Sequence, residues 1–540
     1  MVYLTEIREN RFYNIVTSLF VLLILLTGCA VNGEEESRIT VLPESGAVVT
    51  LGGTELFSVK PAGTAVTWSV DGIPGGNEGT VGTVDTDGKY TAPVDANSAP
   101  EQVVVSAADT SGSSASSIAF LTTFKANKRL TTHYTAGNSS SNTYSSGQKN
   151  IAVFKESDAV VNVYAVWSDN SSGVYKVYFA KSSDGGSSFD EPVLIDDTSL
   201  GEQFSPAIAA DGNGDIFIVW EDRGQGDADI LLRKYDSATQ GFESINQINL
   251  DTIEVTDYDT TPSIAISSEE IYVVWEHRED ISDDYPAIYF ARSSNHGSTF
   301  PDRTYLSLAG RRPAVAMDSG GVAYVVWEDL GEELEQFPDI PTQVKLRKIS
   351  GGTPGDTLDI EVASGYNARF PSIAVDPICN TTGDSICDLY VVYQRALISN
   401  AGFGSEVVNS YNIDLTIIDG ETLDIIKPAV IVPDSGSTGI VANKAYPAVA
   451  ADDSNIYIVW DDLSGETKSV YLTKSSDGNN FATKRIVNDD IGNNGIGISW
   501  HEKPGIAVAD GKAYVIWTDY RNTQLSATAS PNDVFFAVEQ

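Results

Sequence analysis

Acidic side chains recur in this chain directly after short apolar segments that end in an aromatic residue. Carboxylates at such points can move protons, bind cations, or accept hydrogen bonds from backbone N–H groups. A property that successive repeats share is usually architectural, so we expect most of these acids to cap strands or bind a neighbouring loop, with direct ligand contact as the alternative. The segments are Ser168-Asp169, Glu221-Asp222-Arg223, Glu276-His277-Arg278, Glu328-Asp329, Asp461-Asp462 and Thr518-Asp519-Tyr520-Arg521.

Cationic side chains near these acids differ from repeat to repeat, which makes them better ligand candidates. The chain has 34 Lys and Arg against 75 Asp and Glu, a net charge of -41. On so acidic a surface we expect each cation to form a salt bridge first and to contact a ligand second. The same charge repels polyanions, which excludes nucleic acid as a main partner. The candidates are Arg223, Arg278, Arg311, Arg312, Arg369, Arg395, Arg521, His277 and His501.

One acidic loop carries oxygen ligands at alternating positions. Asp222, Asp227 and Asp229 stand in the run Asp222-Arg223-Gly224-Gln225-Gly226-Asp227-Ala228-Asp229, and hard cations such as Ca²⁺ prefer carboxylate oxygens. The run lacks the full EF-hand pattern and its closing Glu. Polar β-turns are therefore the alternative explanation, and Ca²⁺ is the one cofactor that we consider.

Internal repeats dominate the chain after residue 149. The repeats average about 56 residues, a period typical of propeller blades rather than of helical solenoids. Each begins with an apolar strand that Pro usually introduces and continues with a strand that ends in an aromatic residue. The seven aromatic residues are Trp167, Trp220, Trp275, Trp327, Tyr393, Trp460 and Trp517.

These repeats predict an all-β fold in which residues 150–540 form a seven-bladed β-propeller, with six blades as the alternative. The last repeat stops after its third strand at residues 533–538. We expect residues 130–134 or a neighbouring segment to supply its outer strand, because a closed ring leaves no unpaired edge. Residues 126–149 are therefore predicted to be a linker that contains the closing strand.

Two turns between the third and fourth strands resemble the Asp-box, or BNR, hairpin of the sialidase-like superfamily. Their polar residues hold the turn, their Gly permits positive φ, and their Phe plugs a blade core. Residues 475–481 form a degenerate third copy. The resemblance implies the propeller fold, with these hairpins on the face opposite the active site. The matching residues are Ser182, Asp184, Gly186 and Phe189, and Ser293, Asn295, Gly297 and Phe300.

The same resemblance raises the possibility of sialidase chemistry. Family sialidases are six-bladed, grip a carboxylate with three Arg, and use a Tyr-Glu nucleophile pair with an Asp acid/base. Here Ala368-Arg369-Phe370-Pro371 only partly matches the family's first Arg motif. The spacing does not require a catalytic site. The candidates that the resemblance implies are Arg369 with Arg278, Arg395 and Arg521 for the clamp, Tyr520 and Glu276 for the nucleophile pair, and Asp222 for the acid.

Residues 38–125 alternate short β-rich runs with turn clusters, which predicts a small β-sandwich. The segments Val66-Thr67-Trp68-Ser69-Val70-Asp71-Gly72 and 82–93 resemble bacterial Ig-like domains. We expect Trp68 to lie in the core of this sandwich. The resemblance implies a spacer that holds the propeller away from a membrane.

The first residues indicate export. A polar stretch with Arg8 and Arg11 precedes the apolar run 15–26, which is too short to span a bilayer. The run ends in Leu26-Thr27-Gly28-Cys29, which resembles the lipobox of bacterial lipoproteins. Residues 1–28 would then be a cleaved signal peptide, with an ordinary secretory signal as the alternative. Cys29 would carry the lipid that anchors the protein to the cell envelope, at the outer membrane or cell surface, and residues 29–37 would form an acidic tether.

Oxidising conditions outside the cytoplasm favour a disulfide between Cys379 and Cys387, which are eight residues apart. Together these features predict an envelope-anchored lipoprotein whose propeller binds a glycan or an envelope protein without catalysis. An exo-acting glycoside hydrolase, most plausibly a sialidase, is the alternative. Glycan binding predicts aromatic platforms around the axial mouth, whereas hydrolysis predicts three convergent Arg above a hydrogen-bonded Tyr and Glu.

Overall fold

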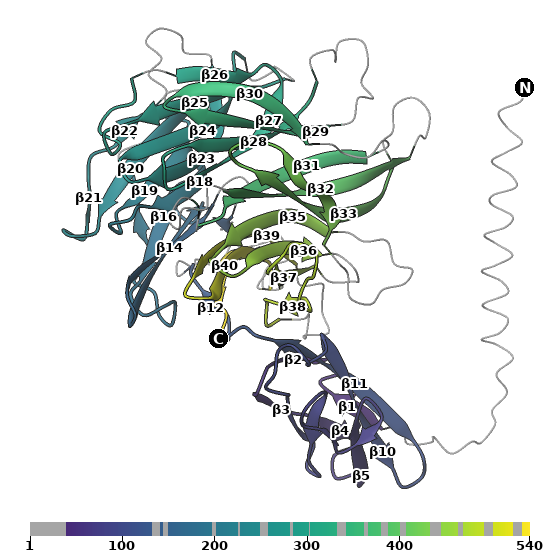
Figure 1. Ribbon diagram of the computed structural model, residues 1–540. Helices are drawn as coiled ribbons and strands as arrows, with labels where there is room; N and C mark the ends of the chain where they lie inside the picture. Colours follow the sequence, from purple (N-terminus) through teal and green to yellow (C-terminus); the bar gives the residue numbers. More distant parts are fainter. Residues whose placement is uncertain are drawn as a thin grey trace, which may run out of the picture.

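The computed structural model is built from β-strands in two units (Figure 1). Within the described residues, no helix is long and apolar enough to cross a lipid bilayer. The structure describes residues 39–131, 141–143, 149–196, 201–224, 227–248, 257–280, 285–301, 303–331, 342–360, 366–377, 379, 387–399, 407–432, 444–462, 468–490, 500–521 and 532–540. Lipidation at Cys29, the signal peptide and the acidic tether fall outside these residues and stay predictions.

Seven antiparallel sheets make up the larger unit in the part of the chain that is described. Their first strands contact one another in sequence, and the first contacts the last, so the sheets close into a ring. This arrangement is a seven-bladed β-propeller. The innermost strands are β14 (Ile151–Ser157), β18 (Gln203–Ala210), β23 (Tyr258–Ser267), β27 (Gly310–Met317), β31 (Tyr366–Val375), β35 (Lys444–Ala451) and β39 (His501–Ala509).

The second strand of each blade lies between the innermost and the third strand and pairs antiparallel with both. The second strands are β15 (Val160–Asp169), β19 (Ile216–Asp222), β24 (Glu270–Arg278), β28 (Ala323–Asp329), β32 (Asp388–Ser399), β36 (Ile456–Asp462) and β40 (Lys512–Asp519). The third strands are β16 (Lys176–Ser182), β20 (Asp229–Asp236), β25 (Ala287–Ser293), β29 (Gln343–Ser350), β33 (Val407–Asp419), β37 (Ser469–Ser475) and β41 (Asp533–Val538).

The outer strand of blade seven comes from the segment before the ring, as the sequence predicted. Lys128 pairs with Phe536 and Arg129 with Phe535, and Leu130 N–H donates to the Val534 carbonyl at 2.8 Å. The two ends of the propeller thus share one sheet, which leaves no free edge between the first and last blades. The outer strands are β17 (Val193–Leu194), β21 (Gly241–Phe242) with β22 (Asn246–Gln247), β26 (Arg303–Ser307), β30 (Thr353–Ile360), β34 (Ile425–Ile431), β38 (Arg485–Ile486) and β12 (Lys128–Arg129).

Large aromatic side chains fill the spaces between blades. The repeated Trp or Tyr of each second strand is almost fully buried in all seven blades, and each strand continues at least two residues beyond it. Trp167 stacks on Tyr178 of the next strand with centroids 6.3 Å apart, and Trp460 stacks on Tyr471 at 6.2 Å. Buried rings of this size contribute much of the apolar area that stabilises a sheet-on-sheet fold.

The two turns that resemble the Asp-box lie at the opposite end of the strands from the rim acids, because the third strand runs antiparallel to the second. In the first turn, Ser182 Oγ accepts from Gly186 N–H at 2.9 Å, and Asp184 accepts from Ser188 N–H at 2.9 Å. Phe189 packs edge-on against Phe536 of blade seven at 5.0 Å. The second copy is similar, since Ser293 accepts from Gly297 N–H at 3.0 Å.

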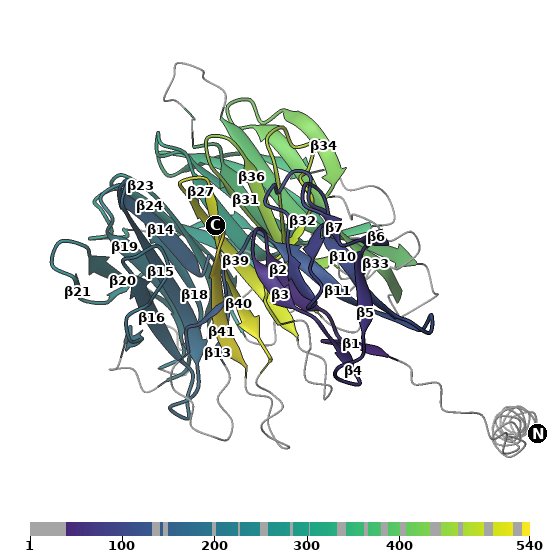
Figure 2. The same cartoon turned by 90° about the horizontal axis from the view of Figure 1, so that it is seen from below.

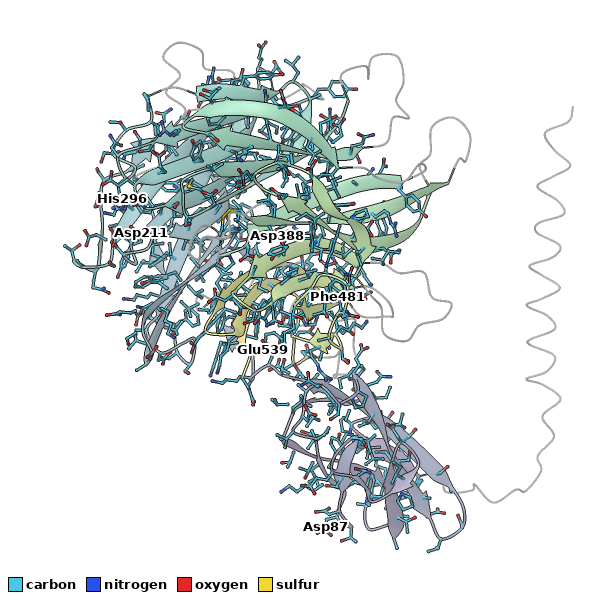
Figure 3. All side chains as sticks on the ribbon, viewed as in Figure 1. Asp87, Asp211, His296, Asp388, Phe481 and Glu539 are labelled. Atoms are coloured by element: carbon cyan, nitrogen blue, oxygen red, sulfur yellow. A yellow bond between two sulfur atoms is a disulfide. The ribbon has the colours of Figure 1, made fainter. Side chains whose placement is uncertain are left out.

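The second Asp-box hairpin also links two blades. His296 Nε2 lies 2.8 Å from Asp211 Oδ2, which belongs to the turn after β18 (Figure 3). Asp211 Oδ1 accepts two backbone N–H groups of its own turn, from Asn213 and Asp215, each at 2.8 Å. Asp211 thus acts as a turn residue.

Residues 39–122 form a smaller β-sandwich with one shared core. Trp68 is buried in that core, as predicted, and a Cβ at Gly88 would lie 2.2 Å from the Phe57 carbonyl, so only Gly fits beneath the ring. The strands are β1 (Thr40–Leu42), β2 (Ala47–Thr50), β3 (Thr54–Leu56), β4 (Ser58–Lys60), β5 (Val66–Val70), β6 (Ile73–Pro74), β7 (Gly76–Asn77), β8 (Gly82–Val84), β9 (Lys89–Thr91), β10 (Gln102–Asp109) and β11 (Ser114–Thr122).

The sandwich contacts the propeller at blade six, through β11 and β38 (Figure 1), and Figure 2 shows both units from below. Arg485 of β38 donates to three backbone carbonyls of the sandwich: Ala96 at 2.7 Å, Ala99 at 2.8 Å and Pro100 at 2.5 Å. Lys484 lies 3.5 Å from Glu101. The guanidinium is buried, and this burial lowers the pKa of Arg485. The two units are therefore joined by a desolvated polar contact as well as by the linker.

Candidate functional site

A ring of strained residues surrounds the axial mouth at the rim where the second strands end. In six blades the innermost strand contains a β-bulge just before its Pro, and the register shifts there. The bulge residue has a positive φ between 48° and 55°, a conformation that side chains other than Gly rarely adopt. Such strain persists only where the surroundings hold it, and it is common at binding sites. The six residues are Ser205, Thr261, Arg312, Phe370, Tyr446 and Lys503.

The rim acids hold these bulges in place from the preceding blade. Glu276 Oε1 accepts from Arg312 N–H at 2.7 Å, and Asp461 Oδ2 accepts from Lys503 N–H at 3.1 Å. Glu221 accepts a hydrogen bond from the backbone N–H of Thr261 in the same way. These three contacts confirm the prediction that the acids at these positions hydrogen-bond to the neighbouring blade.

The first blade departs from this pattern. Ser141 and Asn142 of β13 pair with the end of β15, and Thr143 N–H donates to Thr518 Oγ1 of blade seven at 2.9 Å. Thr143 therefore occupies the position of a bulge residue. Residues 144–148 separate it from Lys149, which stands where the other six blades have Pro.

Two of the bulge residues bring aromatic rings together at the mouth. The rings of Phe370 and Tyr446 have centroids 4.5 Å apart and are tilted by 57°. The guanidinium of Arg312 lies 4.3 Å above the Phe370 ring, and Lys468 Nζ lies 5.3 Å from the Tyr446 ring. All three bulge side chains are half-buried, so each keeps an accessible part.

An exposed tryptophan lies on the same rim. Trp500 is 42% exposed, whereas the other seven Trp side chains are buried. Its carbonyl accepts from Tyr520 N–H at 2.9 Å, and its backbone bridges to Lys468. Trp500 therefore stands where blade seven begins, beside the polar groups of blades six and seven.

The rim has an exposed cationic layer above a buried acidic one. The side chains of Arg223, Arg278, Arg312 and Lys503 are 23–42% exposed. Their acidic partners, among them Glu276 and Glu328, are at most 15% exposed. A ligand at the mouth would meet cations first, although the whole chain is strongly acidic.

Blades six and seven share the densest polar cluster of the rim. Lys468 Nζ lies 3.2 Å from Asp461 Oδ2 and 3.0 Å from Glu502 Oε2, and Tyr520 donates to Glu502 Oε1 at 2.9 Å. Burial raises the pKa of Asp461 to about 7 against the opposing charge of Lys468. Burial opposes ionisation of Glu502 too, but the charges of Lys468 and Lys503 lower its pKa.

Two carboxyl groups whose pKa values are pushed apart could divide acid and base roles. Asp461 is fully buried and accepts the Lys503 N–H, however. Glu502 is the carboxylate of this cluster that keeps some exposure. The arrangement suits ligand contact at Glu502 and Tyr520, with Asp461 in a structural position beneath them.

The catalytic candidates from the sequence are spread around the ring. Arg278 ends β24 in blade three and lies 3.2 Å from Glu276. Arg369 lies in β31 of blade five, opposite Gln394. Arg521 follows β40 of blade seven, where Asp519 holds it at 2.8 Å and Asp489 at 2.7 Å.

The expected pairing of Tyr520 with Glu276 is wrong. Tyr520 bonds to Glu502 of its own blade, whereas Glu276 belongs to blade three and binds Arg312 and Arg278. The sequence did not identify Glu502 as the partner of Tyr520. The acidic candidates were those that follow the repeated aromatic residue, as Glu276 does, whereas Glu502 lies two residues before a Pro.

The candidate acid Asp222 is occupied by local hydrogen bonds. It accepts from Gln203 Nε2 at 3.0 Å and from Gly224 N–H at 2.8 Å. Its cross-strand partner is Asp229, which accepts from Gln247 at 2.9 Å. These contacts suit a turn residue.

The calcium candidates do not gather into one ligand set. Within the described ranges, the groups of three His, Cys, Asp or Glu with ligand atoms within 4.8 Å of one another are Asp318, Cys379 and Cys387, and Asp211, Asp215 and His296. Asp222, Asp227 and Asp229 are not such a group. Cys379 and Cys387 form a disulfide, which leaves the first group without thiolates, and Asp215 pairs with Lys234 at 2.8 Å.

Of the six bulge residues, the sequence reasoning identified Arg312 alone, as a cation. The repeated Pro predicts where each innermost strand begins but not the conformation of the residue before it. The residue before the Pro differs between blades, from Ser205 and Thr261 to Arg312, Phe370 and Tyr446. This variation at a fixed position of the repeat is the signal that could have identified the bulge residues.

Comparisons with known proteins show similarity in shape alone. No family model and no curated protein sequence matches this chain. Similar solved structures include an alpha-L-arabinanase of Penicillium chrysogenum complexed with arabinobiose, with 12% identity over 62% of this chain and 92% of that one and a TM-score of 0.39.

Two further structures are similar at the same level. The GH93 alpha-L-arabinofuranosidase of Fusarium graminearum with arabinobiose has 10% identity over 77% of this chain and 98% of that one, with a TM-score of 0.39. A PL25 ulvan lyase has 12% identity over 57% and 78%, with a TM-score of 0.37. At these values the similarities carry no argument about what this chain binds or does.

Proposed function

We propose that the propeller binds a glycan at its axial mouth, without catalysis, and that the protein is an exported lipoprotein anchored through Cys29. The observation that carries the binding site is the tilted pair of Phe370 and Tyr446, held at the mouth by two strained bulges. Aromatic faces beside exposed polar groups suit sugars, whose rings have both apolar faces and hydroxyl edges.

The surrounding groups favour an acidic glycan. Arg312 and Lys503 are half-buried and more exposed than the acids that they pair with, and a guanidinium can bind a carboxylate or sulfate with two hydrogen bonds. Trp500 offers a further exposed ring on the rim. An envelope protein with an acidic surface loop is the second kind of ligand that this layer would accept.

A glycan array tests the proposal. The parent chain is compared with the double variant Phe370→Ala/Tyr446→Ala and with Tyr305→Ala, a control that removes an exposed ring from the outer strand of blade three. We expect the parent and the control to bind the same acidic glycans and the double variant to lose them. Equal binding by all three proteins would refute the mouth as the site.

The hydrolase alternative has one observation in its favour. Tyr520 and Glu502 are hydrogen-bonded on the rim, and a Tyr-Glu pair is the nucleophile in the sialidase-like family that the Asp-boxes resemble. The test is release of a fluorophore from sialoside and arabinofuranoside substrates. If the parent releases it and Glu502→Gln and Tyr520→Phe do not, hydrolysis replaces binding as the function of the propeller. We expect no release.

The lipid anchor has its own test. Mass spectrometry of the N-terminal peptide from a bacterial host is expected to show diacylglycerol on Cys29, and Cys29→Ser is expected to release the protein from membranes. An unmodified Cys29 after export would indicate an ordinary secretory signal.

A further inference from the structure

A cavity of about 280 Å³ lies on the axis of the propeller, apart from the rim groups described above. All seven innermost strands contribute to its wall, with side chains such as Ile208, Ala265, Met317 and Val375. Met317 and Val375 are half-exposed, so solvent reaches the cavity. A space of this size holds several water molecules, at about 30 Å³ each, or one small organic molecule.

Lys149 is the one charged residue among the described residues that line the cavity. It stands where six blades have Pro, at positions 206, 262, 313, 371, 447 and 504. Its carbonyl accepts from Ile208 N–H at 2.8 Å, and the next residue, Asn150, donates to the Pro206 carbonyl at 2.9 Å. These bonds fix the backbone, so the position of the lysine side chain on the cavity wall is built into the fold.

The ammonium of Lys149 has no ion pair or hydrogen bond with another described residue. Burial alone lowers the pKa of Lys149 to about 8. Lys149 is half-buried, and a charge held beside apolar side chains is stabilised by an ionic partner. An anion that enters the cavity would supply such a partner, at a position where the other six blades have Pro.

We propose that the axial cavity binds a short aliphatic monocarboxylate, whose carboxylate pairs with Lys149 Nζ and whose alkyl chain lies against the Ile, Val, Ala and Met side chains. A sugar acid fits these walls poorly, because its hydroxyl groups would lose their hydrogen bonds to water. The inference is independent of glycan binding at the mouth.

Calorimetric titration of the full chain with sodium butyrate tests the proposal, with sodium glucuronate, 1-butanol and sodium chloride as comparison ligands. We expect butyrate to bind and the other three not to bind. In Lys149→Met the affinity for butyrate is expected to fall at least about tenfold, the size of effect that loss of one buried ion pair produces. Lys89→Met, which removes an exposed lysine from the sandwich, is expected to bind like the parent.

Two further measurements separate binding from a structural role. Lys149→Met is expected to melt no lower than the parent without ligand, because it removes a half-buried charge that has no ion pair with another described residue. Butyrate affinity is expected to fall as pH rises above about 8, since Lys149 is the titratable group among the described lining residues and loses its charge there.

Unchanged butyrate binding in Lys149→Met, or no binding by the parent, would overturn the proposal. Glucuronate binding as tight as butyrate would also overturn it, because the ligand class would then be a sugar acid. If Lys149→Met fails to fold, Lys149→Gln in the same titration decides.

Discussion

The backbone N–H of Lys503 donates to Asp461 Oδ2 at 3.1 Å, so an acid at the end of a strand in blade six holds the strained bulge of blade seven. The same relationship joins Glu276 of blade three to Arg312 of blade four. The acids therefore contribute to the site indirectly, by fixing the backbone from which the mouth side chains project.

Removing one of these acids should destabilise the ring locally. Glu276→Ala leaves the Arg312 N–H and the Arg278 guanidinium without their acceptor, and an unsatisfied buried donor costs about 1–3 kcal/mol. We expect a lower unfolding midpoint in urea than for Glu191→Ala, which truncates an exposed acid. Equal midpoints would show that the bulge does not depend on Glu276.

Stability should depend on pH through Asp461. Its folded pKa, about 7, exceeds the ordinary value of 3.8, so the folded state binds more protons than the unfolded state between these pH values. The stabilisation that the protonated Asp461 carboxyl gives the folded state is fully present below about pH 4 and is lost as pH rises through 7. Because Asn cannot ionise, Asp461→Asn should gain melting temperature relative to the parent between pH 5 and pH 8. A difference that stays constant across this range would contradict the raised pKa.

The closing strand should be essential to the propeller. Leu130 is buried in the cluster that joins blades one and seven, and Leu130→Ala should cost about 2–5 kcal/mol. Leu308→Ala, at an exposed position on blade three, is the matched control and should have little effect. If both variants unfold at the same urea concentration as the parent, closure by residues 128–130 does not stabilise the ring.

The buried Arg485 should couple the two units. Arg485→Met removes three hydrogen bonds to the sandwich and should separate one calorimetric transition into two. Arg347→Met is a suitable control, because Arg347 donates to the Gly355 and Leu306 carbonyls within the propeller. A single transition in Arg485→Met would mean that coupling of the two units does not depend on Arg485.

Much of the fold was predictable because each blade repeats the same local chemistry. The strand-ending aromatic residues gave the seven second strands, and the incomplete last repeat indicated a closing strand from the N-terminal side. That strand, Lys128–Arg129, lies slightly before the range expected, since pairing with Phe535 and Phe536 depends on a register that local sequence does not encode.

The site was harder to predict because it arises from contacts between blades. Glu502 and Tyr520 are 18 residues apart and meet only because β39 and β40 pair antiparallel. Phe370 and Tyr446 come from different blades, and the approach of their rings depends on two bulges. The spacing of residues within one repeat predicts neither the Glu502–Tyr520 contact nor the Phe370–Tyr446 contact.

Calorimetric titration of the strongest array glycan tests binding at the mouth most directly. Loss of stacking on the two rings in Phe370→Ala/Tyr446→Ala should weaken binding at least about tenfold, since each aromatic contact contributes about 0.5–1.5 kcal/mol and 1.4 kcal/mol is tenfold in affinity. Tyr305→Ala should leave the dissociation constant unchanged. A double variant that binds the glycan as tightly as the parent would contradict the account.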